Sequence, residues 1–383
     1  MEKTCSSLRV KNHLSYCYLC ILLFCTSCSP GAEKFIEAEI FELHEYETIV
    51  SNENYNLAEP TVLSVIGESK MLVYDHALGY VTEFDFGGNK EREIGREGQG
   101  PGEFFLLNNI IAHSDKLYFI DFGQALIHKY SRDGEHSSSL DYGALGYITS
   151  PAPPMGTGSV MARELTHQPH LTFRGNVLLS PALASELPDK IFHKVTWEGE
   201  KQFGLGRIPE GSTLELNPEE NRTAISNNET PPNDKANVFA VNDLKNTDEF
   251  FFVYSAIPRI DKYDYDGELL WTVDIPGVPE LEDYRKRHSE LVETLTPASW
   301  ISFNKYMTGV SSPDGDLFLA TNTNPELPGP LWIHRFDSEG NMAARYTIKS
   351  DVNTPPIFDI DFENNRFLVV TEEAEIRAYR FDP

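Results

Sequence analysis

Short apolar segments that alternate with turn residues recur along most of the chain. One pattern occurs six times: an apolar residue, a polar residue, a usually charged residue and then, in most copies, an aromatic residue. The copies are Val81–Phe84, Ile127–Tyr130, Phe192–Val195, Ile260–Tyr263, Ile333–Phe336 and Ile376–Tyr379. Gly-centred turns such as Asp133-Gly134 and Asp266-Gly267 often follow and favour tight hairpins. The pattern therefore predicts one β-strand per copy.

A second apolar strand precedes each copy and ends in Asp, Ser or Thr. These strands are Met71–Asp75, Leu117–Asp121, Val177–Ser180, Phe251–Ser255, Leu317–Thr321 and Phe367–Thr371. Short polar side chains at such ends can bond neighbouring backbone groups and stop a strand. A further strand precedes each pair, near Thr61–Val65, Ile110–Ala112, Leu171–Phe173, Val238–Val241, Met307–Val310 and Ile357–Ile360. A more polar fourth strand often follows the turn.

Six units of about four strands predict an all-β fold, a six-bladed β-propeller of four-stranded blades. Inner blade strands are covered on both faces by neighbouring blades, which explains their unbroken apolar runs. The sixth unit ends at Phe381-Asp382-Pro383 without an outer strand. The N-terminal segment Phe35–Phe41 alternates apolar and polar residues and is predicted to supply that strand and close the ring. A pair of β-sandwiches or an open solenoid is the alternative.

The charge balance narrows the range of partners. The chain of 383 residues has 59 Asp and Glu against 32 Lys and Arg, a formal net charge of −27. Such a field repels a phosphate backbone, so no nucleic-acid role is expected. All five cysteines lie within the first 28 residues, which excludes a disulfide framework in the main domain.

The N-terminal residues have the features of an export signal. Basic residues precede the apolar run Leu14–Phe24, which is shorter than the roughly 20 residues of a membrane-spanning helix. A small residue then precedes Cys28. This arrangement resembles a bacterial lipoprotein signal, which implies lipidation of Cys28, a signal peptide over residues 1–27, a tether over 28–34 and the propeller over 35–383. An ordinary cleaved signal with incidental cysteines is the alternative.

The loop Gly95–Phe104 carries a second resemblance. Its sequence, GREGQGPGEF, resembles the glycine-rich segment of NHL-type propellers. Together with the signal, it makes the whole chain similar to the six-bladed propeller lipoproteins of Bacteroidota. The resemblance implies a lipid anchor in the cell envelope, at the outer membrane and either periplasmic or surface-exposed, but no activity. A phosphate cradle is not indicated, because a strand rather than a helix follows the loop.

Three long connections, residues 142–169, 207–235 and 276–304, are predicted to build up one rim of the propeller. Long loops in compact domains are usually functional or disordered. Within the third, Glu280–Leu295 has helical spacing and is expected to be either a lid on the blades or a partner-binding helix. The candidate ligand- or partner-binding residues on this rim are His76, Tyr80, Arg96, Gln99, Phe122, Gln124, Trp300 and Trp332. Packing within the loops is the alternative role for each of them.

Metal and catalytic chemistry are only weakly indicated. His167 and His170 form a His-x-x-His pair, but the spacing places no third ligand. The segment Asp261–Gly267 is similar to a calcium loop but fits better as a blade turn. No catalytic residue, metal or cofactor is therefore predicted. We expect a lipid-anchored envelope module that binds an unknown protein or small ligand at its loop-rich face; the alternative is a metal-dependent hydrolase or lactonase with its site at the channel mouth.

Overall fold

The computed structural model describes residues 38–67, 69–146, 169–179, 190–213, 217–297, 299, 301–321, 329–349, 351–353 and 356–382. The predicted signal, the tether and Cys28 lie outside these residues. No helix in the described ranges is long and apolar enough to cross a membrane.

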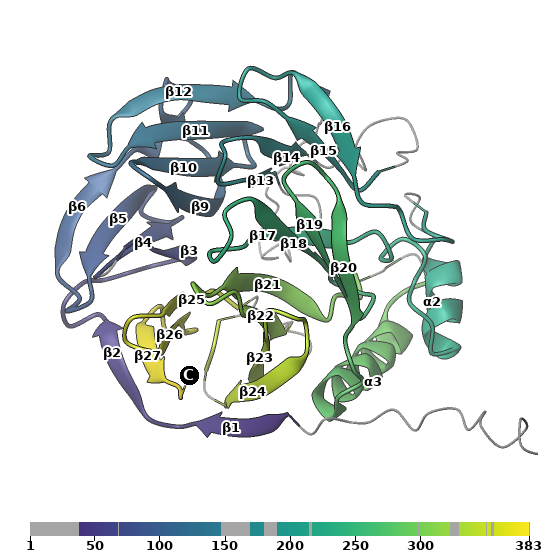
Figure 1. Ribbon diagram of the computed structural model, residues 1–383. Coiled ribbons are helices and arrows are strands. Elements are labelled where there is room, and N and C mark those ends of the chain that lie inside the picture. Colours follow the sequence, from purple (N-terminus) through teal and green to yellow (C-terminus); the bar gives the residue numbers. More distant parts are fainter. Residues whose placement is uncertain are drawn as a thin grey trace, which may run out of the picture. The chain divides into compact units, whose positions relative to one another are not determined.

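Six sheets surround a central channel, which confirms the predicted all-β six-bladed propeller (Figure 1). In each of the first four blades, strand order from the channel outward follows chain order. Blade 1 has β3 (Pro60–Val65), β4 (Lys70–Asp75), β5 (Tyr80–Asp85) and β6 (Lys90–Ile94). Blade 2 has β9 (Leu107–His113), β10 (Lys116–Asp121), β11 (Leu126–Ser131) and β12 (His136–Asp141). Blade 3 has β13 (His170–Leu171), β14 (Val177–Leu179), β15 (Phe192–Val195) and β16 (Lys201–Leu205).

The last three blades follow the same plan until the chain closes on itself. Blade 4 has β17 (Val238–Asn242), β18 (Glu249–Tyr254), β19 (Arg259–Asp264) and β20 (Leu269–Asp274). Blade 5 has β21 (Tyr306–Ser311), β22 (Leu317–Thr321), β23 (Leu331–Phe336) and β24 (Met342–Ile348). Blade 6 has β25 (Phe358–Asp361), β26 (Arg366–Val370) and β27 (Ile376–Arg380). Two N-terminal strands, β1 (Glu39–Leu43) and β2 (Tyr46–Val50), complete blades 5 and 6.

An N-terminal strand closes the ring, but it is not the predicted Phe35–Phe41. Strand β2 pairs antiparallel with β27 and supplies the outer strand of blade 6. Strand β1 instead lies parallel to β24 and gives blade 5 a fifth strand. Successive side chains of β1 point to opposite sides. The ring of Phe41 therefore stacks on that of Tyr346, whereas Ile40 is 48% exposed. Strand β2 was missed because its first three residues are polar and exposed, and only Ile49 and Val50 reach the core.

The hydrophobic core lies between neighbouring blades. The second strands β4, β10, β18 and β26 are almost entirely buried, as their unbroken apolar runs predicted. Between blades 1 and 2, for example, Leu72 and Tyr74 pack with Leu117 and Phe119. Each blade therefore buries both faces of its central strands, as the repeat requires.

The meander places the loops on two opposite faces. The connections between blades and the turns between second and third strands lie on one face, here called the connecting face. The turns between first and second and between third and fourth strands lie on the other, here called the turn face. Each helix lies in one of the two blade connections that flank blade 4: α2 (Pro218–Ser226) and α3 (Pro279–Thr294).

Helix α3 confirms the predicted helix at Glu280–Leu295 and packs on the blades as a lid. Its buried residues Leu281, Tyr284, His288 and Val292 follow the predicted spacing. Helix α2 was not predicted, because the segment is polar. Its start is nevertheless marked by Asn217, whose side chain accepts a hydrogen bond from the Glu220 amide at 3.3 Å, and by Pro218 at the first turn.

Candidate functional site

The glycine-rich loop between blades 1 and 2 folds into two short parallel strands, β7 (Arg96–Glu97) and β8 (Glu103–Phe104). Gly102 has φ +75°, and an added Cβ would lie 2.6 Å from the side chain of His136, so only glycine fits there. Glu103 Oε2 accepts from the Gly100 amide at 2.8 Å, and Glu103 Oε1 accepts from Arg96 Nε at 2.7 Å. These two donors lower the pKa of Glu103.

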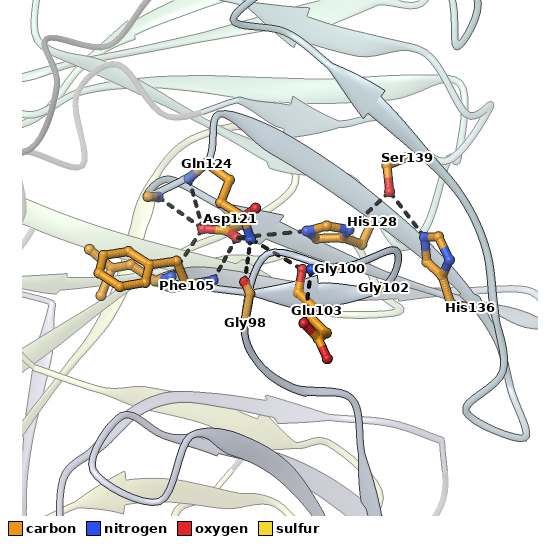
Figure 2. Close-up of polar contacts among 12 residues, drawn as sticks. Gly98, Gly100, Gly102, Glu103, Phe105, Asp121, Gln124, His128, His136 and Ser139 are labelled. Carbon is orange, nitrogen blue, oxygen red and sulfur yellow. Dashed lines mark hydrogen bonds and ion pairs between the residues drawn. The ribbon is translucent and has the colours of Figure 1, made fainter.

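Asp121, at the end of β10, anchors this loop (Figure 2). Its carboxylate accepts hydrogen bonds from the backbone amides of Phe105, Leu106, Gly123 and Gln124 and from the Gln124 side chain, at 2.8–3.2 Å. Burial alone would raise the pKa of Asp121, but His128 and these amides outweigh it and lower the pKa. Asp75 anchors the connection into blade 1 in a similar way, by accepting hydrogen bonds from the backbone amides of Ala58, Glu59 and Leu78. The strand-ending aspartates therefore hold the connections between blades.

Beside Asp121 lies a row of side chains with the composition of a hydrolytic triad. His128 Nδ1 is 2.9 Å from Ser139 Oγ, which is 3.0 Å from His136 Nε2 (Figure 2). On the other side, His128 Nε2 is 3.7 Å from Asp121 Oδ2, beyond hydrogen-bond reach. Asp121 is already occupied by backbone donors, and His128 is only 1% exposed between the strands. Ser139 is exposed and His136 half-buried, so this pair is accessible, but no carboxylate of the described residues lies within hydrogen-bond distance of His128 to orient it as a triad requires.

The described candidate residues lie on the connecting face, in blades 1 and 2 around the glycine-rich loop and, for Trp332, in blade 5. His76 contacts the hydroxyl of Tyr74 at 3.1 Å. Tyr80 shares a hydrogen bond of 3.0 Å with Tyr55, which together with burial raises the Tyr80 pKa. Trp332 is half-buried at the start of β23, in blade 5.

In the glycine-loop region, four further candidates differ in exposure. Arg96 and Gln99 are exposed, whereas Phe122 is half-buried and its amide donates to Leu106 O at 2.9 Å. Gln124 donates to the carbonyl oxygens of Gly98 and Glu103 at 3.1 Å, so its side chain braces the loop. Trp300 lies outside the described residues.

In the part of the chain that the structure describes, no group of three or more His, Cys, Asp and Glu side chains could hold a metal ion. His170 is described and His167 is not. Asp261, from the segment similar to a calcium loop, instead accepts from Arg259 at 2.7 Å, Tyr254 at 3.0 Å and Thr272 at 2.8 Å. That segment forms the strand and turn of blade 4, as preferred from its sequence.

A buried ionic cluster fastens α3 to blade 5. Glu280 Oε1 is 2.9 Å from His334 Nε2, and Glu280 Oε2 is 3.1 Å from an Arg345 nitrogen. Tyr306 OH contacts His334 Nδ1 at 2.6 Å, and both side chains have no exposed surface. Burial would raise the pKa of Glu280, but its contacts with His334 and Arg345 lower it. This cluster was not predicted from the sequence, because its members are far apart along the chain.

The central channel holds a cavity of about 500 Å³. All six inner strands line it: β3, β9, β13, β17, β21 and β25. The lining extends to residues of the first-to-second-strand turns, among them Gly67, Leu244, Pro313 and Phe362. The cavity therefore lies toward the turn face, and none of the described candidate residues lines it.

The cavity wall combines apolar and polar groups, and none of its described residues is a lysine or arginine. Asp359 on β25 lines it and is partly exposed. Its Oδ2 accepts from the Val65 amide of blade 1 and its Oδ1 from the Ile360 amide, each at 2.7 Å. Burial without a cationic neighbour raises the Asp359 pKa to about 6. Asp361, next along the wall, is instead paired with Arg366 at 2.7 Å.

On the opposite wall, His170 of β13 is 8% exposed, and its Nε2 has no hydrogen-bond partner among the described residues. Burial lowers the His170 pKa to about 4, so the ring is neutral at physiological pH. Asn242 of β17 also lines the cavity and donates to Leu171 O at 2.8 Å. Polar residues such as these inside apolar inner strands were the one sequence signal for the cavity.

The DUF5128 family model, a 6-bladed β-propeller, matches residues 28–145, less than half of the chain. The protein is a six-bladed β-propeller. A comparison with curated proteins finds no match.

Solved structures with this propeller fold cover most of the chain. One is described as an exported protein of Bacteroides fragilis, with 14% identity, TM-score 0.51 and coverage of 90% of this chain and 99% of that one. Another is a DUF4221 family member of Bacteroides vulgatus, with 8% identity, TM-score 0.52 and coverage of 89% and 97%. A gluconolactonase of Xanthomonas campestris has 10% identity, TM-score 0.46 and coverage of 87% and 88%. At these identities the likeness shows the fold alone.

Proposed function

We propose that the chain is an exported, lipid-anchored propeller of the cell envelope that binds a small ligand in its central channel and acts as a binding module. The observation that carries this proposal is the cavity of about 500 Å³ enclosed by all six inner strands. Small-molecule sites are typically concave, mostly apolar and of a few hundred Å³, with a few placed polar groups. The channel has this composition, with apolar inner-strand residues and the polar side chains of Asn242, Thr308 and Asp359.

A binding role agrees better with the polar clusters than a hydrolytic one. The Asp121 carboxylate is occupied by loop amides, and the Glu280 carboxylate by His334 and Arg345. Both carboxylates hold structure together and are not available to orient a catalytic base. The metal-dependent alternative has no three-ligand group in its favour within the described ranges.

Channel binding is tested with two substitutions of one lining residue, Thr308: one that narrows the channel and one that does not. Thr308 lines the cavity on β21 and is partly exposed. Native mass spectrometry of the full-length protein, purified as the cell processes it, measures small molecules retained from envelope extract. We expect retention by the wild type and by Thr308→Ser, and reduced retention by Thr308→Phe, whose larger side chain narrows the channel. Equal retention by the Phe variant would place the ligand elsewhere and refute the proposal.

The anchor is tested separately, through the two neighbouring cysteines. We expect Cys28→Ala to release the protein from the membrane fraction and to abolish incorporation of a labelled fatty acid. Cys25→Ala is the matched control and should leave both unchanged. Membrane retention and labelling of Cys28→Ala would contradict the lipid anchor without bearing on the channel.

A protein partner at the connecting face remains a second proposal, favoured by one observation. Arg96 and Gln99 are exposed at the tip of the glycine loop, which Gln124 and Asp121 hold in place. A rigid loop with an exposed Arg is a suitable contact point. Cross-linking in cells followed by pull-down should recover a partner with the wild type and lose it with the double variant Arg96→Ala, Gln99→Ala. An unchanged partner set would reject this surface.

A further inference from the structure

The charge of the cavity wall limits the ligands that it can accept. Among the residues that the structure describes, three carboxylates line the cavity, Asp359, Asp361 and Glu363, all from blade 6, and no lysine or arginine does. Asp361 is neutralised by Arg366, which lies outside the lining. Because a carboxylate in a partly desolvated site repels anions, an anionic ligand is disfavoured here. The net charge of −27 also repels anions, over longer distances.

Asp359 is the carboxylate that a ligand can neutralise. Its partners in the described chain are two backbone amides, which together leave lone pairs of its two oxygens unused. A desolvated carboxylate without a counter-charge is unfavourable, and a cation placed beside it removes that cost. The described part of the cavity wall supplies no such cation.

The rest of the wall suits the body of an organic cation. Three aromatic side chains line the same cavity as Asp359: Phe173 of blade 3, Phe239 of blade 4 and Phe358, which precedes Asp359 in blade 6. Aromatic faces attract ammonium groups and pack against apolar bodies. Across the ring, three blades away, the unpartnered Nε2 of His170 is a second polar group that the protein leaves unsatisfied.

We propose that the channel ligand is an organic amine, bound as its ammonium ion to the carboxylate of Asp359 with its apolar body against the phenylalanines. This inference rests on the proposed channel-binding function and adds the charge class of the ligand to it. It distinguishes the channel from sites for sugar acids, phosphates and other anions, which the wall would repel.

The test uses three probes of similar size that differ in charge: 2-phenylethylamine, 2-phenylethanol and 3-phenylpropanoate. Isothermal titration calorimetry of the full-length protein at pH 7.5 should show binding of the amine and weaker binding of the alcohol, by about tenfold or more. The carboxylate should bind most weakly. Equal affinity for amine and alcohol, or no binding of the amine, would overturn the inference.

Two variants distinguish the effect of the Asp359 carboxylate from the effect of the protein's overall charge. Asp359→Asn should weaken amine binding about tenfold or more and leave the alcohol unchanged. Asp337→Asn is the matched control, because Asp337 caps an exposed turn of blade 5 by accepting from Asn341 and carries the same charge. Loss of amine binding in both variants, or in neither, would reject Asp359 as the anchor.

A pH titration of the wild type provides a test that needs no variant. The amine stays protonated throughout, whereas Asp359 takes up a proton as the pH falls through about 6. Amine affinity should therefore fall between pH 7.5 and pH 5, and alcohol affinity should not. If Thr308→Phe reduces ligand retention while amine affinity shows no pH dependence, the channel binds ligands of another class. If the Phe variant still binds the amine at full affinity, channel binding itself is refuted.

Discussion

Replacing Asp359 with Asn is expected to make the protein more stable at neutral and alkaline pH. In the folded chain the carboxylate is desolvated beside the channel, and burial raises its pKa from an ordinary value of 3.8 to about 6. A raised carboxyl pKa means that the folded state prefers the protonated form, so ionisation costs stability as the pH rises. Asn removes that ionisation while keeping nearly the same shape.

The size of the effect follows from the pKa shift. About two pKa units correspond to about 3 kcal/mol of destabilisation at pH 8, at roughly 1.4 kcal/mol per unit. Asn keeps one acceptor oxygen for the Val65 amide but presents an NH2 group to the Ile360 amide, which forfeits about 1 kcal/mol. The net expectation is a gain of about 2 kcal/mol at pH 8. Because the wild type regains protons below pH 6, this gain should shrink by about 1.5 kcal/mol at pH 5.

Urea unfolding followed by circular dichroism measures the effect at both pH values. Wild type, Asp359→Asn and the surface control Asp337→Asn are compared, so that the general pH dependence of the propeller cancels in the differences. The reasoning fails if Asp359→Asn is less stable than the wild type at pH 8. It also fails if the stability difference does not change with pH, since the shifted pKa requires that it change.

Four further substitutions probe the structural clusters, each checked by urea unfolding against the wild type. Asp121→Ala strands the loop amides that it binds and should cost about 3 kcal/mol, whereas Ser139→Ala should cost under about 1 kcal/mol; a larger loss for Ser139 would contradict its packing role. Glu280→Ala leaves Arg345 without its buried counter-charge and should cost about 3–5 kcal/mol, with faster hydrogen exchange in α3. Gly102→Ala combines a positive φ with a close contact and should cost more than about 1 kcal/mol; a neutral result would show that the loop relaxes.

Local residue patterns predicted most of the fold because the blade repeat is a local property. Each second strand is covered on both sides and is apolar throughout, so its sequence alone marks it as buried, as in Phe367–Thr371. The closing strand β2 was not found, because an outer blade strand has one solvated face and Tyr46–Val50 is mostly polar. Helix α2 was also missed because its segment is mostly polar, and only its capping residues indicated a helix.

The candidate site was less predictable, because it depends on distances across the ring. The rim residues were chosen for residue type on loops of the connecting face, yet Gln124 is used to brace backbone carbonyls and Tyr80 to bond Tyr55. The cavity is built from inner strands, where single residues such as Asp359 and His170 interrupt apolar runs. Such an interruption indicates a channel group only once the register shows which side of the strand faces the axis.

The interlocking of both ends of the described chain has a consequence for biogenesis. Strands β1 and β2 are among the first to be synthesised, yet their partners β24 and β27 come from the last two blades. During synthesis the edges of β1 and β2 therefore stay open until the strands of the last two blades have been made. The ring cannot close on a truncated chain, so a polypeptide interrupted before Ile376 would keep an unpaired edge and be recognisable to quality-control proteases.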